Sequence, residues 1–407
     1  MQNLRIWKYL SLPWMAIALF FFITFIFLAF FKGTSIEYLT NDYLLGLFKN
    51  TFILSFLTAF ISALIAMPLA ILVTFYDFPG RKFFSWSLSL SIAFPAYVYA
   101  FIYVGIFEYS SPISSYLRDF NIALPSIKNL FGASIILSMA LFPYIYLLLR
   151  VKLASVGLDL FRAAKSLGNN NTTSILKVII PSLLPVVIAG MTLVIFETIA
   201  DFGGVSTLRI ETFTVGIYNA WFGYQSYFSA ARLAGYLLIF VFVIIFIAKF
   251  YESKQSNLAQ KTSEVFEGME LVPYKRFLAT FYCGSIFTIV FLIPLGQLLI
   301  WSFEKNNFLS INNLHLFFNS LTLGLIVSVV TVFFGIALAL AYRNEKNLRL
   351  IISISTSGYA IPGSVISAGL LVSFGYFFNI SITSFGIIGL IFCLSLRFMT
   401  PAYNYLS

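Results

Sequence analysis

Charge is scarce in this sequence. Only 10% of its 407 residues are Asp, Glu, Lys or Arg, whereas 60% are hydrophobic and the mean hydropathy is +0.94. A soluble domain carries roughly 25% charged residues, and one soluble core could not cover this much apolar surface. We therefore predict a polytopic membrane protein and exclude a soluble enzyme. The net charge of +10 does not indicate nucleic-acid binding, because the cations occur in short clusters between apolar runs.

Side chains that commonly bind metals or perform redox chemistry are also few. The two cysteines, Cys283 and Cys393, lie in separate apolar runs and form neither a CxxC pair nor a disulfide framework. The single histidine, His315, can build neither a zinc site nor a triad, so we expect it to be solvated in an outer loop. The sequence has no GxxxxGK[ST] phosphate loop. We therefore predict that this chain is not an enzyme, binds no cofactor and does not hydrolyse ATP by itself.

Apolar runs recur along the whole chain, each long enough to cross about 30 Å of hydrocarbon. The first run follows Arg5 and Lys8 and has no small-residue cleavage site after it, so we interpret it as a retained helix. The runs predict ten membrane helices, near residues 13–31, 50–75, 83–107, 131–150, 182–202, 233–250, 278–301, 318–342, 351–377 and 384–403.

The positive charges predict the orientation of these helices. With the N-terminus in the cytoplasm, eighteen of the 25 Lys and Arg residues fall in inner segments and seven in outer segments. Cytoplasmic loops carry an excess of Lys and Arg, so we expect a cytoplasmic N-terminus. Arg397 is expected to open a further cytoplasmic loop.

The sequence around Asn50 is repeated around Asn319. In both places an Asn precedes a long apolar helix, a short charged turn follows, and the next helix contains a proline, Pro95 or Pro362. The separations from Asn to Pro, 45 and 43 residues, nearly agree. Although any two hydrophobic hairpins share part of this pattern, two repeats of the same orientation are typical of transporters. The predicted fold class is therefore an all-α polytopic membrane protein built from two tandem repeats.

A polar stretch from Glu252 to Arg276 is the clearest change in composition, and we interpret it as a cytoplasmic linker between the repeats. The second repeat has no counterpart of the loop that follows the fourth helix, so we expect it to be incomplete. Either the sequence is a fragment or the second half is degenerate, and we favour the fragment. The predicted division is 1–47 for the N-terminal cytoplasmic end, first helix and outer loop, 48–250 for the first transmembrane domain, 251–277 for the linker, 278–317 for the first helix of the second half and its outer loop, and 318–407 for the truncated second transmembrane domain.

The most informative segment is the predicted cytoplasmic loop after the fourth helix. Asp159 can cap a short helix, Ala163 and Ala164 can give it a smooth face, and Gly168 can end it in the left-handed conformation. A second helix should begin near residues 172–174 and bend into the membrane at its prolines, Pro181 and Pro185. We predict a short helix lying along the cytosolic membrane surface and suited to docking into a partner.

This segment resembles the EAA loop of the permease subunits of bacterial ABC importers. The resemblance lies in Ala163 and Ala164, in Gly168 and in a later Ile-Pro pair that ends at Pro181, while Arg162 stands where the family has glutamate. In that family the loop forms the coupling helix that seats in the ATPase subunit. The resemblance thus implies an ATPase-coupling role for these five residues and a type I importer fold in the bacterial inner membrane. It also implies two partners, an ATP-binding cassette ATPase dimer that binds the ATP and an extracytoplasmic substrate-binding protein.

A second stretch, from Glu197 to Gly223, is similar to the corresponding region of ferric-iron permeases, which are fused double-length chains. The similarity lies in a Glu-Thr-x-Ala-Asp-Phe-Gly segment followed by Thr-Phe-Thr-x-Gly-Ile-Tyr-x-Ala-Trp-Phe. It implies ferric iron as the substrate. Thiamine, polyamines, sulfate and phosphonate remain alternatives within the class, and a secondary transporter driven by an ion gradient is the alternative from another class.

Two carboxylates, Glu197 and Asp201, are four residues apart on the predicted fifth helix and therefore share one face. Glu197 is expected roughly 16 Å along this helix from Val186, near the middle of the bilayer. Carboxylates inside a membrane are functional by default, and hard oxygen ligands suit ferric iron, so both are candidate metal-contacting residues of the translocation path. In the alternative interpretation, Glu197 pairs with an interior polar group and Asp201 caps the break at Phe202-Gly203-Gly204.

Three tyrosines, Tyr97, Tyr99 and Tyr103, follow Pro95 closely. Their hydroxyls could line a pathway, but aromatic residues near a helix end more often belong to the interfacial belt, which is the interpretation that we favour.

Overall fold

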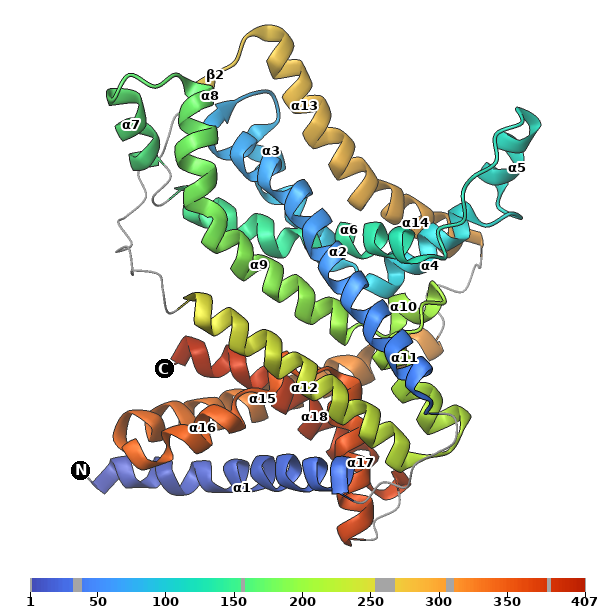
Figure 1. The fold of residues 1–407 in the computed structure, drawn as a ribbon, viewed down its shortest axis with the longest axis vertical. Helices are drawn as coiled ribbons and strands as arrows, with labels where there is room; N and C mark the ends of the chain where they lie inside the picture. The colour runs from blue at the N-terminus through green and yellow to red at the C-terminus, as the bar shows by residue number, and fades with distance from the viewer. Residues whose placement is uncertain are drawn as a thin grey trace. The chain divides into compact units, whose positions relative to one another are not determined.

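The computed structural model describes residues 2–31, 39–154, 158–252, 268–304, 311–378 and 382–406, and these residues are almost entirely helical (Figure 1). The chain divides into two compact units. The first unit comprises Met1–Phe48, Thr212–Val243 and Lys305–Ser407, and the second comprises Lys49–Glu211 and Ile244–Glu304. The predicted all-α polytopic class is confirmed.

Two long helices, α2 (Asn41–Phe75) and α12 (Tyr227–Glu252), run from one unit into the other. The other helices of the first unit are α1 (Gln2–Phe31), α11 (Phe213–Tyr218), α15 (Ile311–Asn344), α16 (Arg349–Ser355), α17 (Gly363–Phe378) and α18 (Ile382–Leu406). The second unit holds α3 (Arg81–Ser87), α4 (Ala96–Phe107), α5 (Pro112–Asp119), α6 (Leu130–Lys152), α7 (Leu158–Ser166), α8 (Asn171–Ser174), α9 (Ile180–Ala200), α10 (Gly203–Thr207), α13 (Pro273–Phe287), α14 (Ile293–Glu304) and two short strands, β1 (Tyr76–Asp77) and β2 (Met269–Glu270).

Among the described residues, eight helices are long and apolar enough to cross a membrane. A ninth crossing is possible for the pair Arg81–Ala93 and Ala96–Asp119, which is bent by 89°. The prediction of ten continuous helices was therefore wrong in two places. The expected helix at 83–107 is broken before Pro95, and the expected helix at 351–377 is divided into α16 and α17 before Pro362.

The two breaks have the same local cause. The residues that precede the prolines, Phe94 (φ −99°, ψ 122°) and Ile361 (φ −92°, ψ 125°), are extended. The proline ring disfavours helical geometry in the residue before it. A long helix, a short helix, a 3₁₀ turn, the extended residue and a new apolar helix thus follow one another in both halves of the sequence.

Some expectations about single residues need correction. Asn50 and Asn319 lie inside α2 and α15 instead of before them, because both helices begin eight or nine residues earlier. His315 is exposed as expected, but it lies on α15 and its Nδ1 is 3.2 Å from Asn319 Nδ2. Arg397 lies inside α18 instead of opening a loop, because α18 continues to Leu406. Residues 253–267 of the expected linker lie outside the described residues, and the predicted domain boundaries stay a prediction.

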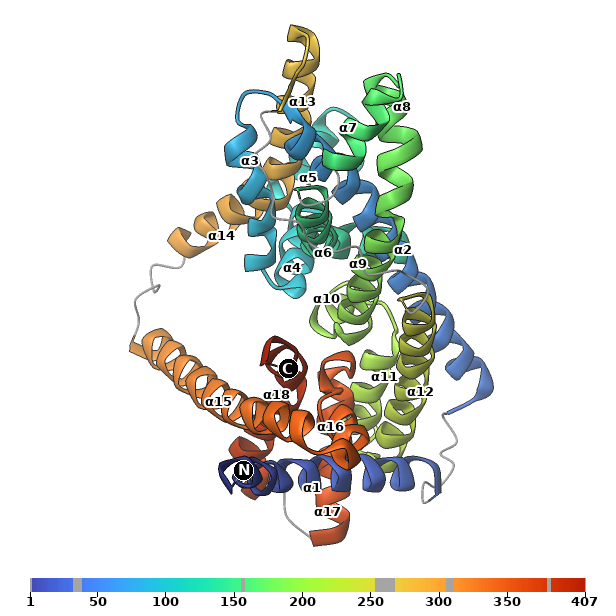
Figure 2. The ribbon, with the colours of Figure 1, turned by 90° about the vertical axis from the view of Figure 1, so that its left-hand side faces the viewer.

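The N-terminal helix of each half packs against the other half. In the first unit, α1 packs against α15, α16 and α17, and α17 crosses it (Figure 2). Trp14 Nε1 donates to Ser355 O at 3.4 Å, and a Cβ atom at Gly369 would come within 2.9 Å of the Phe25 ring. In the second unit, α13 packs on α3 and α14 packs on α4. The first helix of each half of the sequence is therefore buried against helices of the other half.

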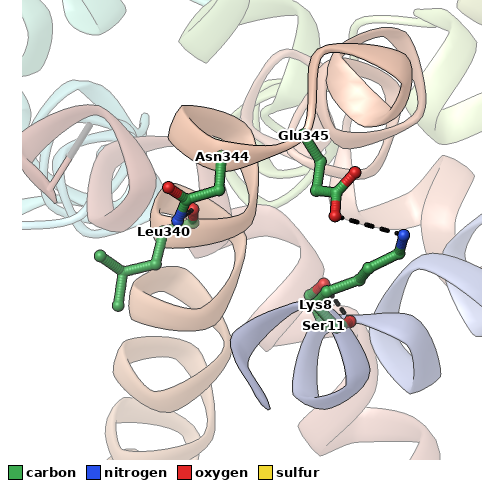
Figure 3. A network of polar contacts seen from close by, with 5 residues as sticks. All are labelled: Lys8, Ser11, Leu340, Asn344 and Glu345. Carbon is green, nitrogen blue, oxygen red and sulfur yellow. Dashed lines mark hydrogen bonds and ion pairs between the residues drawn. The ribbon is translucent and has the colours of Figure 1, made fainter. Parts of the chain in front are cut away.

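An ion pair holds the N-terminal end of α1 against the end of α15. Lys8 Nζ lies 3.3 Å from Glu345 Oε1, one residue beyond α15, while the neighbouring Asn344 side chain caps the helix by donating to Leu340 O (Figure 3). Both charged side chains are about one third exposed (37% and 33%). Solvent screening therefore limits this pair to about 1 kcal/mol or less of stabilisation.

Two buried tyrosine hydroxyls donate to carbonyl groups that lack a helical partner. In the π-helical turn Thr288–Leu292 the N–H of Ile293 donates to Thr288 O instead of Ile289 O, and Pro294 has no N–H to donate to Val290 O. Tyr103 Oη donates to Ile289 O at 2.5 Å, and Tyr99 Oη donates to Val290 O at 2.6 Å.

The interfacial belt is therefore the wrong interpretation for Tyr99 and Tyr103, which are 0% and 7% exposed. Tyr97 is 53% exposed. The signal that separates them, a proline almost 200 residues away, is not visible near the tyrosines in the sequence.

We predict that Tyr99→Phe lowers the free energy of unfolding by about 1 kcal/mol, because the carbonyl of Val290 loses its donor. The melting temperature of the purified protein in detergent measures this loss, and Tyr97→Phe is the matched control. In a Pro294→Ala background the restored N–H can bond to Val290 O, so the loss should shrink. Equal losses in both backgrounds would contradict the explanation.

Candidate functional site

The short helix α7 has one buried and one exposed face. Phe161 and Ala164 are 5% and 3% exposed, and the Phe161 ring packs on the ring of Phe75 at the end of α2, with centroids 5.3 Å apart. Arg162, Ala163 and the following Lys165 are exposed. The two alanines therefore do not form one face as expected, because successive residues point about 100° apart around a helix.

The end of α7 is as predicted. Gly168 has φ +88°, its N–H donates to Lys165 O at 3.0 Å, and the next N–H, of Asn169, donates to Ala164 O at 3.2 Å. These two bonds form a Schellman motif, which requires a left-handed residue at the position of Gly168. At the other end, Asp159 lies in the first turn of α7, which begins at Leu158.

The second helix begins at Asn171, close to the expected position. Asn170 Oδ1 accepts the N–H of Thr173 at 2.7 Å and caps it. A π-helical turn at Ile175–Ile179 then leads into α9, so that Asn171–Ala200 forms one span. Pro181 is the second residue of α9, and Ile180 separates it from the π-turn. The N–H that Pro181 lacks would fall where the bonding pattern changes from the π-turn to the α-helix, so its loss does not break the span.

A two-stranded sheet, which the sequence analysis did not predict, joins the linker to the turn after α2. Tyr76 and Asp77, directly after α2, pair in parallel with Met269 and Glu270. Arg81 closes the same turn by donating from Nε to Val73 O at 2.9 Å and from Nη2 to Thr74 O at 3.0 Å. Phe75 packs against Phe161 of α7. The turn after Phe75 is therefore held by β2, the strand that precedes α13.

The two candidate carboxylates lie at the other end of α9. Asp201 Oδ2 accepts the N–H of Val205 at 2.9 Å, which caps the first turn of α10. A Cβ atom at Gly204 would lie 2.6 Å from the same oxygen, and one at Gly203 would lie 2.7 Å from Tyr97 Cβ. The glycines therefore allow the chain to turn tightly against α4, and this hydrogen bond is the one that the capping interpretation of Asp201 requires.

Glu197 is half-buried on α9, one turn before Asp201. Over the described ranges, no group of three or more His, Cys, Asp or Glu side chains is placed to hold a metal ion. Glu197 and Asp201 are thus two carboxylates at the end of one membrane span, and their contact with a transported cation stays a prediction. The remaining candidates, Arg162, Ala163, Ala164, Gly168 and Pro181, lie together at the opposite end of α9.

Comparison with known proteins fits this geometry. Residues 66–263, which contain α7 and both ends of α9, match the family described as the binding-protein-dependent transport system inner membrane component. This part of the chain is a permease domain of that family.

Two relatives represent two kinds of permease. Over 345 residues, or 83% of its length, the chain is 24% identical to the Fe(3+)-transport system permease protein FbpB 2 of Haemophilus influenzae and covers 65% of that protein. Over 169 residues, or 42% of the chain, it is 24% identical to the sulfate transport system permease protein CysT of Escherichia coli and covers 60% of it. The chain thus spans less than two thirds of the length of these relatives.

We predict that Asp201→Ala lowers the free energy of unfolding of the protein by about 1 kcal/mol through loss of the cap on α10. Asp201→Asn should keep most of this stability, because an amide oxygen can also accept the N–H of Val205. Melting temperatures of the two variants in detergent test the difference. An equal loss in both variants would assign the stabilisation to the charge instead of the cap.

Proposed function

We propose that this chain is the membrane-spanning permease of an ATP-driven ABC importer, with its N-terminus in the cytoplasm and its substrate delivered by an extracytoplasmic binding protein. The observation that carries the proposal is α7, a short helix between two membrane spans within the matched domain. Its outer side offers Arg162, Ala163 and Lys165 to a partner, and Leu167 beside them is 82% exposed. ATP binding and hydrolysis take place in a separate ATPase dimer, and this chain contributes no cofactor.

The contacts of α7 suggest how the energy of ATP is transmitted. When the ATPase dimer closes, it displaces α7, whose buried face contacts α2 through Phe161 and Phe75. The capped turn at Asn170 passes the same displacement into the span Asn171–Ala200. A displacement of the whole span would also move Glu197 and Asp201. Such rigid movement of packed helices is the usual means of alternating access.

Ferric iron is the substrate that we propose. The ferric relative is matched over most of the chain, and Glu197 and Asp201 supply the hard anionic oxygens that a small trivalent cation prefers. Sulfate is the second candidate because the shorter match is to sulfate permeases. Two carboxylates at the end of a span would repel a dianion in a medium of low dielectric constant, which favours the cation.

Coupling through α7 is tested at Gly168. Gly168→Val should lower transport several-fold, because a β-branched residue at φ +88° costs about 1–2 kcal/mol of backbone strain. Gly168→Asn is the control, since Asn tolerates this conformation and no atom lies within 4 Å of the added Cβ. Uptake and ATP hydrolysis are measured in vesicles with ATPase and binding protein. If Gly168→Val and Gly168→Asn show equal uptake at equal protein level, α7 has no role in coupling.

The same vesicles discriminate between classes and substrates. We expect ATP to drive ferric uptake that persists when ionophores collapse the ion gradients, whereas a secondary transporter would stop. Glu197→Gln should reduce ferric uptake while binding-protein-stimulated ATP hydrolysis continues, because the charge that attracts the cation is lost. Glu211→Gln, an exposed carboxylate outside the span, is the matched control. If the vesicles take up sulfate and Glu197→Gln leaves this uptake unchanged or raises it, sulfate and not ferric iron is the substrate.

A further inference from the structure

A pocket lies between the end of α4, helix α5 and the segment that leads into α6. Its volume is about 300 Å³, and its polar lining consists of Glu108, Tyr109, Ser114, Arg118, Ser126 and Lys128. Helix α6 has 23 residues, or roughly 34 Å at 1.5 Å per residue, and it runs from this pocket toward α7 (Figure 1). The pocket is thus separate from α7, and its lining includes neither Glu197 nor Asp201.

Arg118 is held in one orientation by neutral partners. Its guanidinium lies over the Tyr109 ring, 3.8 Å from the centroid. Nη1 donates to Tyr109 O and to Ser114 Oγ at 3.2 Å, and Nη2 donates to Ser115 Oγ at 3.0 Å. Ser114 is itself fixed, because its N–H donates at 3.0 Å to Ser111 Oγ, the cap of α5.

This arrangement leaves one edge of the guanidinium without a protein acceptor. None of the hydrogen bonds of Arg118 to the described residues uses Nε–H, and one N–H of Nη2 is also unused. Nε–H and the Nη2 group form the edge with which arginine binds a carboxylate in a bidentate manner. No carboxylate of the described chain lies within 4.0 Å of Arg118.

The second cation of the pocket is already paired, but weakly. Lys128 Nζ lies 3.5 Å from Glu108 Oε1, and the two side chains are 28% and 51% exposed. Such an exposed pair contributes at most about 1 kcal/mol, so another carboxylate can displace Glu108 from Lys128. Together, Arg118, Lys128 and Glu108 give the pocket a net positive charge.

We propose that this pocket receives an aspartate or glutamate side chain of the extracytoplasmic binding protein. The inference rests on the proposed function, which supplies both the outer position of the pocket and the partner. The carboxylate binds the free edge of Arg118, and Leu124 and Ile127 of the lining contact its aliphatic stem. The volume, at the low end for ligand pockets, fits a side chain and its neighbours.

The experiment measures ATP hydrolysis by the complete transporter in lipid nanodiscs against the concentration of its binding protein. In Arg118→Gln the half-maximal concentration should rise about tenfold while saturation is still reached, because one bidentate contact is lost. Glu108→Gln should act in the opposite direction and lower it, since the competing carboxylate is removed. Lys49→Gln, an exposed lysine outside the pocket, should leave it unchanged.

Two outcomes would contradict these proposals. If the wild-type transporter is not stimulated by any binding protein, the proposed function fails and the docking proposal with it. If the wild type is stimulated but Arg118→Gln and Glu108→Gln have the same half-maximal concentration as Lys49→Gln, the docking proposal alone fails.

Sodium sulfate is the probe for a free anion. At constant ionic strength, sulfate should compete with the binding protein in the wild type and not in Arg118→Gln. If sulfate instead changes ATP hydrolysis in the absence of the binding protein, the pocket is a site for a free anion and not for docking.

Discussion

Inside a bilayer no water is available to satisfy a backbone N–H or C=O group, and this constraint accounts for much of the second unit. Pro181 and Pro294 each follow a π-helical turn by one residue, so that the missing N–H falls where the hydrogen-bond pattern already shifts. Next to Pro294, Tyr99 and Tyr103 supply the donors that the helix lacks. These two prolines are thus tolerated within their spans, because a π-turn precedes each of them and buried hydroxyls compensate next to Pro294.

The same residue type has the opposite effect at Pro95 and Pro362. There the preceding residue is extended and the helix ends. The four prolines therefore divide into two kinds, those that a span absorbs and those that interrupt it. The interruptions occur at matching positions of the two halves, which links the internal repeat of the sequence to a local backbone feature. The 3₁₀ turns at both breaks also pack against a later helix, Leu88–Ala93 against α6 and Gly358–Ala360 against α18.

Features that depend on local chemistry could be predicted from the sequence. Hydropathy located most of the spans, and the glycine after α7 was predicted to be left-handed because few other residues adopt that conformation. The helix breaks were missed because an apolar run has no periodicity that distinguishes a straight helix from a broken one. The pairing of Tyr76 with Met269, and the donation from Tyr99 to Val290 across 191 residues, depend on tertiary contacts that no local pattern encodes. For Asp201 the sequence left two roles open, and the hydrogen bond to Val205 adds weight to the capping role.

The first helix of each half packs against the other half, and this arrangement determines when during synthesis the second unit can be completed. Helix α4 enters the membrane with the face that will receive α14 uncovered, and the carbonyl acceptors of Tyr99 and Tyr103 are translated only about 190 residues later. At 5–20 residues per second this delay is about 10–40 s. During that interval the Tyr99 hydroxyl can donate to Ser91 O, its second acceptor at 3.2 Å, whereas the Tyr103 hydroxyl must find a temporary acceptor in lipid headgroups, water or the insertion machinery. The second unit is therefore completed only after translation has passed into the second half, and a ribosome that stalls before Pro294 leaves its core open.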